Sequence, residues 1–234
     1  MQLFYNPDIT NSTKQFSFNK EESKHIVKVL RKNVGDQLHI TNGIGWLFVT
    51  EILIADIKKC TVLIKAKELQ PKRNYNLHIA VAPTKMNDRY QWFLEKATEI
   101  CIESITPIIC DYSERKIIKH ERFAKILQSA MKQSLQCYLP KLNPAIQFKE
   151  YIKQEFNGLL FIAHCQDLNK KSLKQEVRPN QDISILIGPE GDFSVKEIAQ
   201  ALQSNFIPVT LGKTRLRTET AAIVACHTVA LLNE

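Results

Sequence analysis

The stretch ISILIGPEGDFSVKEIAQALQ, Ile183 to Gln203, contains the pattern that decides the fold. Its first part, ISILIG, is apolar apart from Ser184, as expected of a strand that is buried on both faces of a sheet. Ser194 and Glu197 have the spacing of a capping box, which starts a helix. A buried strand that leads through a glycine-bearing turn into a helix is typical of an α/β fold with a mainly parallel sheet.

The alternation of strand and helix continues through residues 73–234. Apolar runs predict further buried strands at 77–82, 104–110, 159–165 and 206–212. Helices are predicted at 88–101, 120–139 and 218–232. The apolar stripes of the first two helices are predicted to include Trp92, Phe93, Lys96, Ala97 and Ile100, and Phe123, Ile126, Leu127, Ala130 and Met131.

Residues 1–72 show a different pattern, dominated by short β-strands. Asn42-Gly43 separates two runs of β character, 34–41 and 44–56, which predicts a hairpin with positive φ at both turn residues. A third run at 60–69 and a short helix at 25–31 complete a small barrel. The polar segment QPKRN, residues 70–74, marks the boundary between domains 1–72 and 73–234.

The net charge of the chain, +8, indicates a polyanionic partner. Between Glu114 and Lys149 there are eight Lys or Arg residues against two Glu, so one region accounts for nearly all of the excess. Nucleic acid is the partner that fits such a basic face best.

The spacing of the cysteines and histidines argues against a metal site. No two cysteines form a CxxC pair, and we expect free thiols in a reducing compartment. His227 lies in the apolar C-terminal run and fits a core or interface position. The N-terminus lacks the apolar run of a signal peptide, and no segment resembles a membrane-spanning helix, so we expect a cytoplasmic protein. The cysteines are Cys60, Cys101, Cys110, Cys137, Cys165 and Cys226.

The letters GKT in LGKTRLRTETAAI, Leu211 to Ile223, suggest a phosphate loop, but the full motif is absent. GxxxxGK[ST] needs a glycine five residues before Gly212, and that position is Ile207. In LHIAVAPTKMNDR, the strand LHIAVA is followed by a segment that contains no glycine. A GxGxxG loop for a dinucleotide, or for the methyl donor of Rossmann-type methyltransferases, is therefore excluded as well.

Two glycine-bearing turns remain, IGPEGDFS (Ile187 to Ser194) and LGKTRLRTETA (Leu211 to Ala221). Each follows a predicted strand, and ligands of open α/β sheets bind outside the carboxyl ends of the strands. Both turns should therefore lie on one rim, where glycine lets a ligand approach the backbone. Thr218 is the predicted N-cap of the last helix, with Glu219 in its first turn. A ligand site and a pair of left-handed turns before capped helices both remain open interpretations.

These two motifs resemble the signature of the bacterial 16S rRNA uridine-N3 methyltransferases, the RsmE type of the SPOUT class. The segments HIVKVLRKNVGDQL, PTKMNDRYQWFLEKATEICIESITPI and QSAMKQS resemble the same family in order and spacing, so the resemblance covers nearly the whole chain. It implies a PUA-like RNA-binding β-barrel for residues 1–72 and a SPOUT α/β domain for residues 73–234. The resemblance further implies a C-terminal trefoil knot, a homodimer and S-adenosyl-L-methionine held in the knot.

The resemblance also implies cofactor-binding residues in three loops. They are Gly188, Glu190 and Gly191 in the first turn, Leu211, Gly212, Leu216, Arg217, Thr218 and Thr220 in the second, and Ala163 and His164 after a third strand. One feature departs from the family, which usually shows a Gly-Arg pair where this sequence has Leu135 and Gln136. The role of that arginine is then either lost or taken by Lys132 or Lys141.

The implied reaction is methyl transfer to N3 of a uridine in 16S rRNA, with the small ribosomal subunit as partner. When N3 loses its proton, negative charge spreads over O2 and O4, and a nearby cation favours the ionised base. Arg217 is the candidate for this catalytic role, with a phosphate contact or a surface ion pair as the alternative. Glu190 is either a base or a structural acceptor. Phosphate contacts are expected from Lys28, Arg31, Arg115, Lys116, Arg122 and Lys125.

Two other functions fit part of the sequence. A non-enzymatic RNA-binding or ribosome-assembly factor accounts for the charge and the barrel, but not for the paired glycine turns. A SPOUT enzyme that acts on tRNA or on another rRNA nucleotide accounts for the turns, but it fits the N-terminal half less well.

Overall fold

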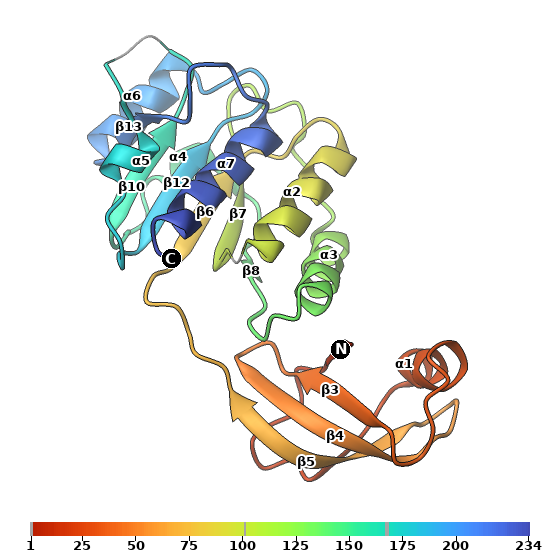
Figure 1. The fold of residues 1–234 in the computed structure, drawn as a ribbon. Helices are drawn as coiled ribbons and strands as arrows, with labels where there is room; N and C mark the ends of the chain where they lie inside the picture. The colour runs from red at the N-terminus through yellow and green to blue at the C-terminus, as the bar shows by residue number, and fades with distance from the viewer. Residues whose placement is uncertain (1, 101, 167–168) are drawn as a thin grey trace. The chain divides into compact units, whose positions relative to one another are not determined.

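The computed structural model describes residues 2–100, 102–166 and 169–234, which form two compact units (Figure 1). One unit contains the residues up to Lys72 together with Met131–Leu139, and the other contains Arg73–Ala130 with Pro140–Glu234. A boundary at residue 72 alone would leave Met131–Leu139 in the second domain. The segment is instead tied to the first unit, because Thr41 Oγ1 donates to the Cys137 carbonyl at 3.2 Å.

The first unit is a curled five-stranded sheet with the strand order β1-β3-β4-β5-β2. Apolar side chains from the sheet and the helical segment, among them Phe4, Ile26, Ile40, Phe48 and Val62, form its core. Its elements are β1 (Leu3–Tyr5), β2 (Gln15–Ser17), α1 (Lys20–Lys24), the π-helical turn η1 (His25–Val29), β3 (Gln37–Thr41), β4 (Trp46–Ile54) and β5 (Thr61–Leu69).

The predicted hairpin is confirmed, because β3 and β4 pair in antiparallel fashion, but its turn differs from the prediction. Positive φ occurs at Gly43 (77°) and Gly45 (99°), so the expectation of a positive φ at Asn42 is wrong. The Asn42 side chain instead closes the turn by accepting from the Ile44 and Trp46 N–H groups at 3.1 and 3.3 Å. An Asx-type turn of this kind uses the side chain where a two-residue hairpin would use the backbone.

The second unit is an α/β domain built on an eight-stranded sheet, in which seven strands follow the order β11-β13-β10-β12-β6-β7-β8 and β9 pairs with β7. Every strand pair in this sheet is parallel, and each predicted buried strand is present. The strands are β6 (Leu77–Val81), β7 (Ser104–Ile109), β8 (Lys141–Leu142), β9 (Ile146–Gln147, paired with β7), β10 (Leu159–Ala163), β11 (Lys171–Ser172), β12 (Ile183–Ile187) and β13 (Ile207–Thr210). The helices are α2 (Asn87–Glu99), α3 (His120–Gln133, of which residues 131–133 belong to the first unit), α4 (Phe148–Tyr151), α5 (Leu173–Glu176), α6 (Val195–Gln203) and α7 (Thr218–Leu231).

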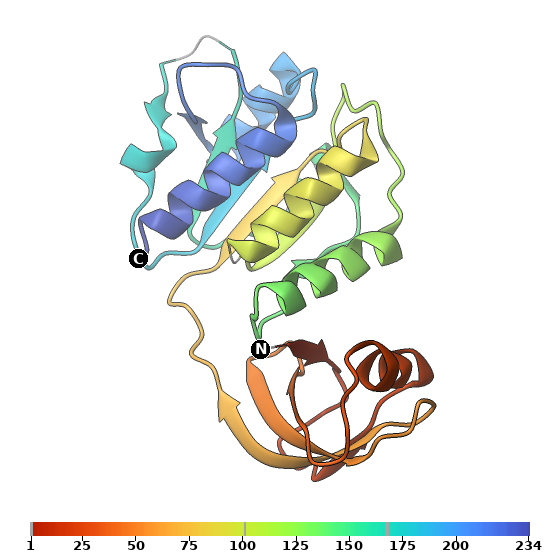
Figure 2. The same cartoon turned by 45° about the vertical axis from the view of Figure 1, so that its right-hand side comes forward.

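Strand order brings together elements that are distant in the sequence. β10 lies between β12 and β13, so the ends of these three strands are neighbours. On one face of the sheet α2 and α7 lie side by side (Figure 2). On the other face, Phe148 and Tyr151 of α4 and Ile198 of α6 belong to the same buried cluster as Ile162 and Leu186 of the sheet. The chain thus crosses from β13, near one edge of the sheet, to α7, which packs on β6 and β12.

The helical stripe is confirmed for four of the five residues predicted in α3, where Ile126 is half-buried, and is partly wrong for α2. Phe123, Leu127, Ala130 and Met131 of α3 are buried. In α2 the buried series begins at Tyr90 and continues through residues 93, 94 and 97, whereas Trp92 is 44% exposed. The buried residues follow the pattern i, i+3, i+4, i+7 that starts at Tyr90. Trp92 lies outside this pattern, so its indole points outward.

Within the described part of the chain, no helix is both long and apolar enough to cross a membrane. Cys60, Cys110, Cys137, Cys165 and Cys226 are free thiols, and Cys101 lies outside the described residues.

Candidate functional site

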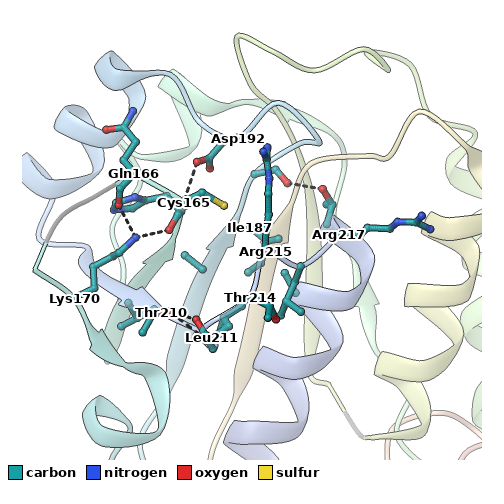
Figure 3. A pocket seen from close by; sticks show the side chains of 18 of the residues that line it. Cys165, Gln166, Lys170, Ile187, Asp192, Thr210, Leu211, Thr214, Arg215 and Arg217 are labelled. Carbon is teal, nitrogen blue, oxygen red and sulfur yellow. Dashed lines mark hydrogen bonds between the residues drawn. The ribbon is translucent and has the colours of Figure 1, made fainter.

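A cavity of about 590 Å³ lies at the carboxyl ends of β10, β12 and β13 (Figure 3). Three loops form its walls: residues 163–166 with Lys170, residues 187–190 with Asp192, and residues 209–218. The structure therefore brings the two glycine-bearing turns and the third loop together on one rim. Of the residues expected at a cofactor site, the cavity is lined by Ala163, His164, Gly188, Glu190, Leu211, Gly212, Leu216, Arg217 and Thr218.

Gly191 and Thr220 do not line the cavity. Thr220 lies in the first turn of α7, half-buried. A Cβ atom on Gly191 would lie 3.1 Å from the Cβ of Tyr112, so this glycine makes room for a neighbouring side chain. Gly188 has a similar reason to lack a side chain, because its Cβ would lie 3.0 Å from the ring of Phe193.

Asp192 joins the first loop to the third-strand loop. Its Oδ2 accepts from the Cys165 N–H at 2.8 Å, and its Oδ1 accepts from the Phe193 N–H at 2.9 Å. The residue has φ of +66°, a conformation that Asp tolerates better than most residues. Sequence reasoning did not select Asp192, although an Asp after a Gly in a turn is a usable signal.

Lys170 holds the loop that follows β10. Its ammonium group donates to the carbonyls of His164 and Gln166 at 2.6 and 2.7 Å (Figure 3). An ammonium group has three donors and no acceptor, so it suits two converging carbonyls. No motif in the sequence pointed to this residue.

His164 is 7% exposed, and neither of its ring nitrogens has a partner among the described residues. Burial, and then the nearby positive charge of Lys170, lower the pKa of the imidazole below its ordinary value, although Asp192 acts in the opposite direction. The ring is therefore neutral at physiological pH and offers one donor and one acceptor. Buried polar atoms without partners on a cavity wall are suited to a bound ligand.

The second glycine turn is linked to the first through Thr218. The prediction that Thr218 is the N-cap of the last helix is wrong, because Arg217 occupies that position and Thr218 is the first helical residue. The Thr218 hydroxyl donates to the Gly188 carbonyl at 3.0 Å instead of capping its own helix. Both residues are buried, so this bond fixes the spacing of two cavity walls.

The two arginines of the second turn have different surroundings. Arg215 donates from Nη2 to the Glu190 carbonyl at 3.4 Å. Arg217 is exposed, and none of the described residues forms a hydrogen bond or ion pair with its guanidinium group. Figure 3 shows Arg217 on the opposite side of the cavity from Lys170. Glu219 lies in the first turn of α7, as predicted, and its Oε1 lies 3.8 Å from Nε of Arg89.

The basic residues expected to contact RNA fall into two groups. Lys28 and Arg31, in the first unit, and Lys116 and Lys125, in the second unit, are exposed. The two remaining arginines take part in contacts within the second unit. Arg115 donates to the Thr84 and Lys85 carbonyls at 3.1 and 2.6 Å, and Arg122 donates to Gln91 Oε1 at 3.3 Å.

Leu135 and Gln136, which stand where the resemblance implies a Gly-Arg pair, lie just after α3. Leu135 has φ of +58°, the left-handed conformation for which glycine is best suited. Gln136 donates from its N–H to the Met131 carbonyl at 3.0 Å, which ends the helix. Leucine in this conformation therefore leaves a strained helix end.

The cavity combines backbone groups at three strand ends with a neutral imidazole. The sequence of its loops contains no glycine-rich phosphate-binding motif. Among the described residues, no cluster of three or more His, Cys, Asp or Glu side chains could hold a metal ion. Its volume lies in the range of sites for small organic ligands, roughly 300–1,000 Å³.

Comparisons with known proteins agree with this geometry. Residues 71–230 match the family described as the RNA methyltransferase domain, and residues 18–65 match the RNA methyltransferase PUA domain. The chain is 34% identical to ribosomal RNA small subunit methyltransferase E of Rickettsia conorii over 214 residues, which cover 89% of this chain and 86% of that protein.

Two solved structures extend the similarity to the fold. The crystal structure of a probable rRNA methyltransferase from Porphyromonas gingivalis is 39% identical, with a TM-score of 0.91 and coverage of 100% of this chain and 98% of the other. A ribosomal RNA small subunit methyltransferase E from Neisseria gonorrhoeae, solved bound to S-adenosyl methionine, is 25% identical. Its TM-score is 0.86, with coverage of 100% of this chain and 98% of the other.

Proposed function

Because the chain belongs to the RNA methyltransferase family with a PUA domain, we propose that it is an S-adenosyl-L-methionine-dependent methyltransferase that acts on N3 of a uridine in 16S rRNA. The observation that carries the proposal is the cavity formed by three loops at the carboxyl ends of β10, β12 and β13. These loops contain the two motifs on which the family resemblance rests.

The residues of the cavity fit S-adenosylmethionine. The neutral His164 offers unpartnered nitrogens to the polar groups of such a ligand, and the backbone at Gly188, Leu211 and Gly212 can read an adenine edge. The cavity also has apolar walls, from Ile187 among others, and S-adenosylmethionine has no phosphate that would need a cationic loop. The bound cofactor would supply an electrophilic methyl group.

The protein's own residues then have to align the base and stabilise its charge. Arg217 is the proposed cation beside O2 or O4 of the uracil, since its guanidinium group is exposed and lies on the cavity wall. Glu190 lines the same cavity, and its Oε2 is buried without a partner among the described residues. This oxygen is the candidate acceptor for the N3 proton.

The chain path supports a knotted C-terminal segment, as in SPOUT enzymes. After β13 the chain returns past the ends of β10 and β12 to reach α7, so the second glycine turn passes across the loop that follows β12. The Thr218 hydrogen bond to Gly188 joins these two segments at the crossing. The knot would then be the feature that forms the cavity.

Further parts of the proposal concern the partners. Half-exposed apolar residues of α7, such as Ile223 and Val224, suit a homodimer interface, and His227 is exposed on the same helix. Lys28 and Arg31, on the PUA-like barrel, and Lys116 and Lys125 are the proposed phosphate contacts with 16S rRNA within the small subunit. The protein would act in the cytoplasm.

The reaction can be tested with the purified chain, methyl-labelled S-adenosylmethionine, and small subunits that lack the modification. Label that co-elutes with 3-methyluridine after digestion of the 16S rRNA to nucleosides supports the proposal. Label in another nucleoside would contradict the assignment to N3 of uridine. Calorimetry with S-adenosylmethionine tests the cavity separately, because an RNA-binding assembly factor would not bind the cofactor.

A further inference from the structure

An exposed aromatic ring lies against the first loop of the cavity. Tyr112 is 56% exposed. A Cβ atom placed on Gly191 would lie 3.1 Å from the Cβ of Tyr112 and 3.7 to 3.8 Å from its ring. The residues on either side of Gly191, Glu190 and Asp192, line the cavity. Tyr112 therefore stands beside the cavity without being part of its wall.

The turn that carries Tyr112 is held in place on both sides. The Cys110 N–H donates to Ser113 Oγ, and the Asp111 N–H donates to Glu197 Oε1, each at 2.9 Å. The Ser194 hydroxyl donates to Asp111 Oδ2 at 2.7 Å. Since Ser194 and Glu197 form the capping box of α6, the turn is fixed to the start of that helix.

Hydrogen bonds also connect the segment after β6 to the Tyr112 turn and to the first cavity loop. Arg115 donates to the Thr84 and Lys85 carbonyls, and the Lys85 N–H donates to Glu190 Oε1 at 2.9 Å. The segment before α2, the Tyr112 turn and the first cavity loop are thus linked by hydrogen bonds. These bonds fix the backbone on both sides of Tyr112, so its exposed ring starts from a defined position beside the first cavity loop.

We propose that Tyr112 stacks on the uracil that is to be methylated and holds its ring beside the cavity. The inference rests on the proposed function. N3 lies on the Watson–Crick edge of uracil, so an enzyme that modifies it must take the base out of pairing and hold it from its face. Single-stranded bases are commonly bound by stacking on aromatic side chains, a contact worth about 10- to 100-fold in affinity. A base stacked on a ring at this place, next to Glu190 and Asp192 of the cavity wall, would keep its edge free to face the cavity.

The test compares Tyr112→Phe, which keeps the aromatic face, with Tyr112→Leu, which keeps an apolar contact with Gly191 but removes the face. For Tyr112→Leu we expect kcat/KM for rRNA to fall about 10- to 100-fold, with cofactor affinity by calorimetry unchanged. For Tyr112→Phe we expect a value within about 2-fold of the parent chain. Thermal unfolding midpoints confirm that each variant folds.

A second readout does not depend on turnover. The Tyr112→Trp variant should lose indole fluorescence on binding an rRNA fragment that contains the target uridine, relative to the same fragment with an abasic site there. The parent chain provides the control for Trp46 and Trp92.

The inference fails if Tyr112→Leu and Tyr112→Phe have equal kcat/KM, or if the abasic fragment gives the same fluorescence change. That outcome would leave the proposed function intact as long as the parent chain forms 3-methyluridine. If the parent chain binds the cofactor but forms no 3-methyluridine, the proposed function fails, and with it the target assigned to Tyr112.

Discussion

The Lys85 N–H donates a hydrogen bond of 2.9 Å to Glu190 Oε1, across 105 residues of sequence. Lys85 belongs to the segment after β6, and Glu190 belongs to the loop after β12, the strand that pairs with β6. The bond therefore extends the contact between two neighbouring strands beyond their carboxyl ends. It leaves only Oε2 of Glu190 without a partner in the described part of the chain.

Replacing Glu190 should separate its structural role from its chemical one. Glu190→Gln keeps an acceptor for the Lys85 N–H, so we expect little loss of stability but a slower reaction, because the proposed proton acceptor is gone. Glu190→Ala removes the acceptor too, and unfolding free energy should fall by about 1–3 kcal/mol. Urea unfolding and single-turnover methylation measure the two effects. Equal stability of the two variants would show that the bond to Lys85 contributes nothing.

Leu135→Gly should stabilise the first unit. Leu135 has φ of +58°, and relief of this strain is worth about 1–2 kcal/mol, partly offset by the greater chain entropy of glycine. We expect a net gain of roughly 0.5–1 kcal/mol in urea unfolding. Leu135→Ala is the matched control, because it shortens the side chain and keeps the strain. A gain of the same size in Leu135→Ala would exclude the backbone as the cause.

Arg217→Ala should leave cofactor affinity nearly normal and slow methylation strongly. Removing one group that stabilises a developing negative charge typically costs about 10²- to 10³-fold in rate. Calorimetry with S-adenosylmethionine and single-turnover kinetics with saturating rRNA make the comparison. The methylation rate of Arg217→Lys, which retains the charge, should lie between those of the parent chain and Arg217→Ala. An unchanged rate for Arg217→Ala would remove Arg217 from the mechanism.

His78 should make stability depend on acidity. Burial, and then the charge of Lys141, lower its pKa from 6.5 to about 4. Above pH 6.5 the imidazole is neutral in both states, and the full stability is present. As pH falls from 6.5 towards 4, the unfolded chain takes up a proton that the folded chain does not, so stability falls by roughly 3 kcal/mol.

The variant His78→Asn tests this dependence, because asparagine can still bond to Ser104, which lies 2.7 Å from His78 Nδ1. Its unfolding free energy should decline less between pH 7 and pH 4.5 than that of the parent chain. Parallel declines would mean that other groups cause the acid sensitivity.

The parallel sheet was predictable because strands buried on both faces leave continuous apolar runs, as at 183–187 and 77–81. The rim was predictable because parallel strands end on the same edge of a sheet. Strand order was not predictable from local pattern, since the position of β10 between β12 and β13 depends on contacts between distant segments.

The contacts that complete the site depend on the same distant pairings. The cavity loops meet only after the sheet has formed. The hydrogen bonds that hold them come from Asp192, from Lys170 and from the Lys85–Glu190 pair. Thr218 shows the limit of a local rule: its hydroxyl suits an N-cap, yet the neighbouring loop offers the Gly188 carbonyl. A threonine at the start of a helix satisfies either pattern, and only the fold decides between them.

The most direct test of the central claim is a map of modified nucleotides in 16S rRNA from cells that lack this protein and from cells in which it is restored. We predict that one 3-methyluridine disappears in the deletion strain and returns with the intact chain, but not with Arg217→Ala. Persistence of every 3-methyluridine in the deletion strain would contradict the account.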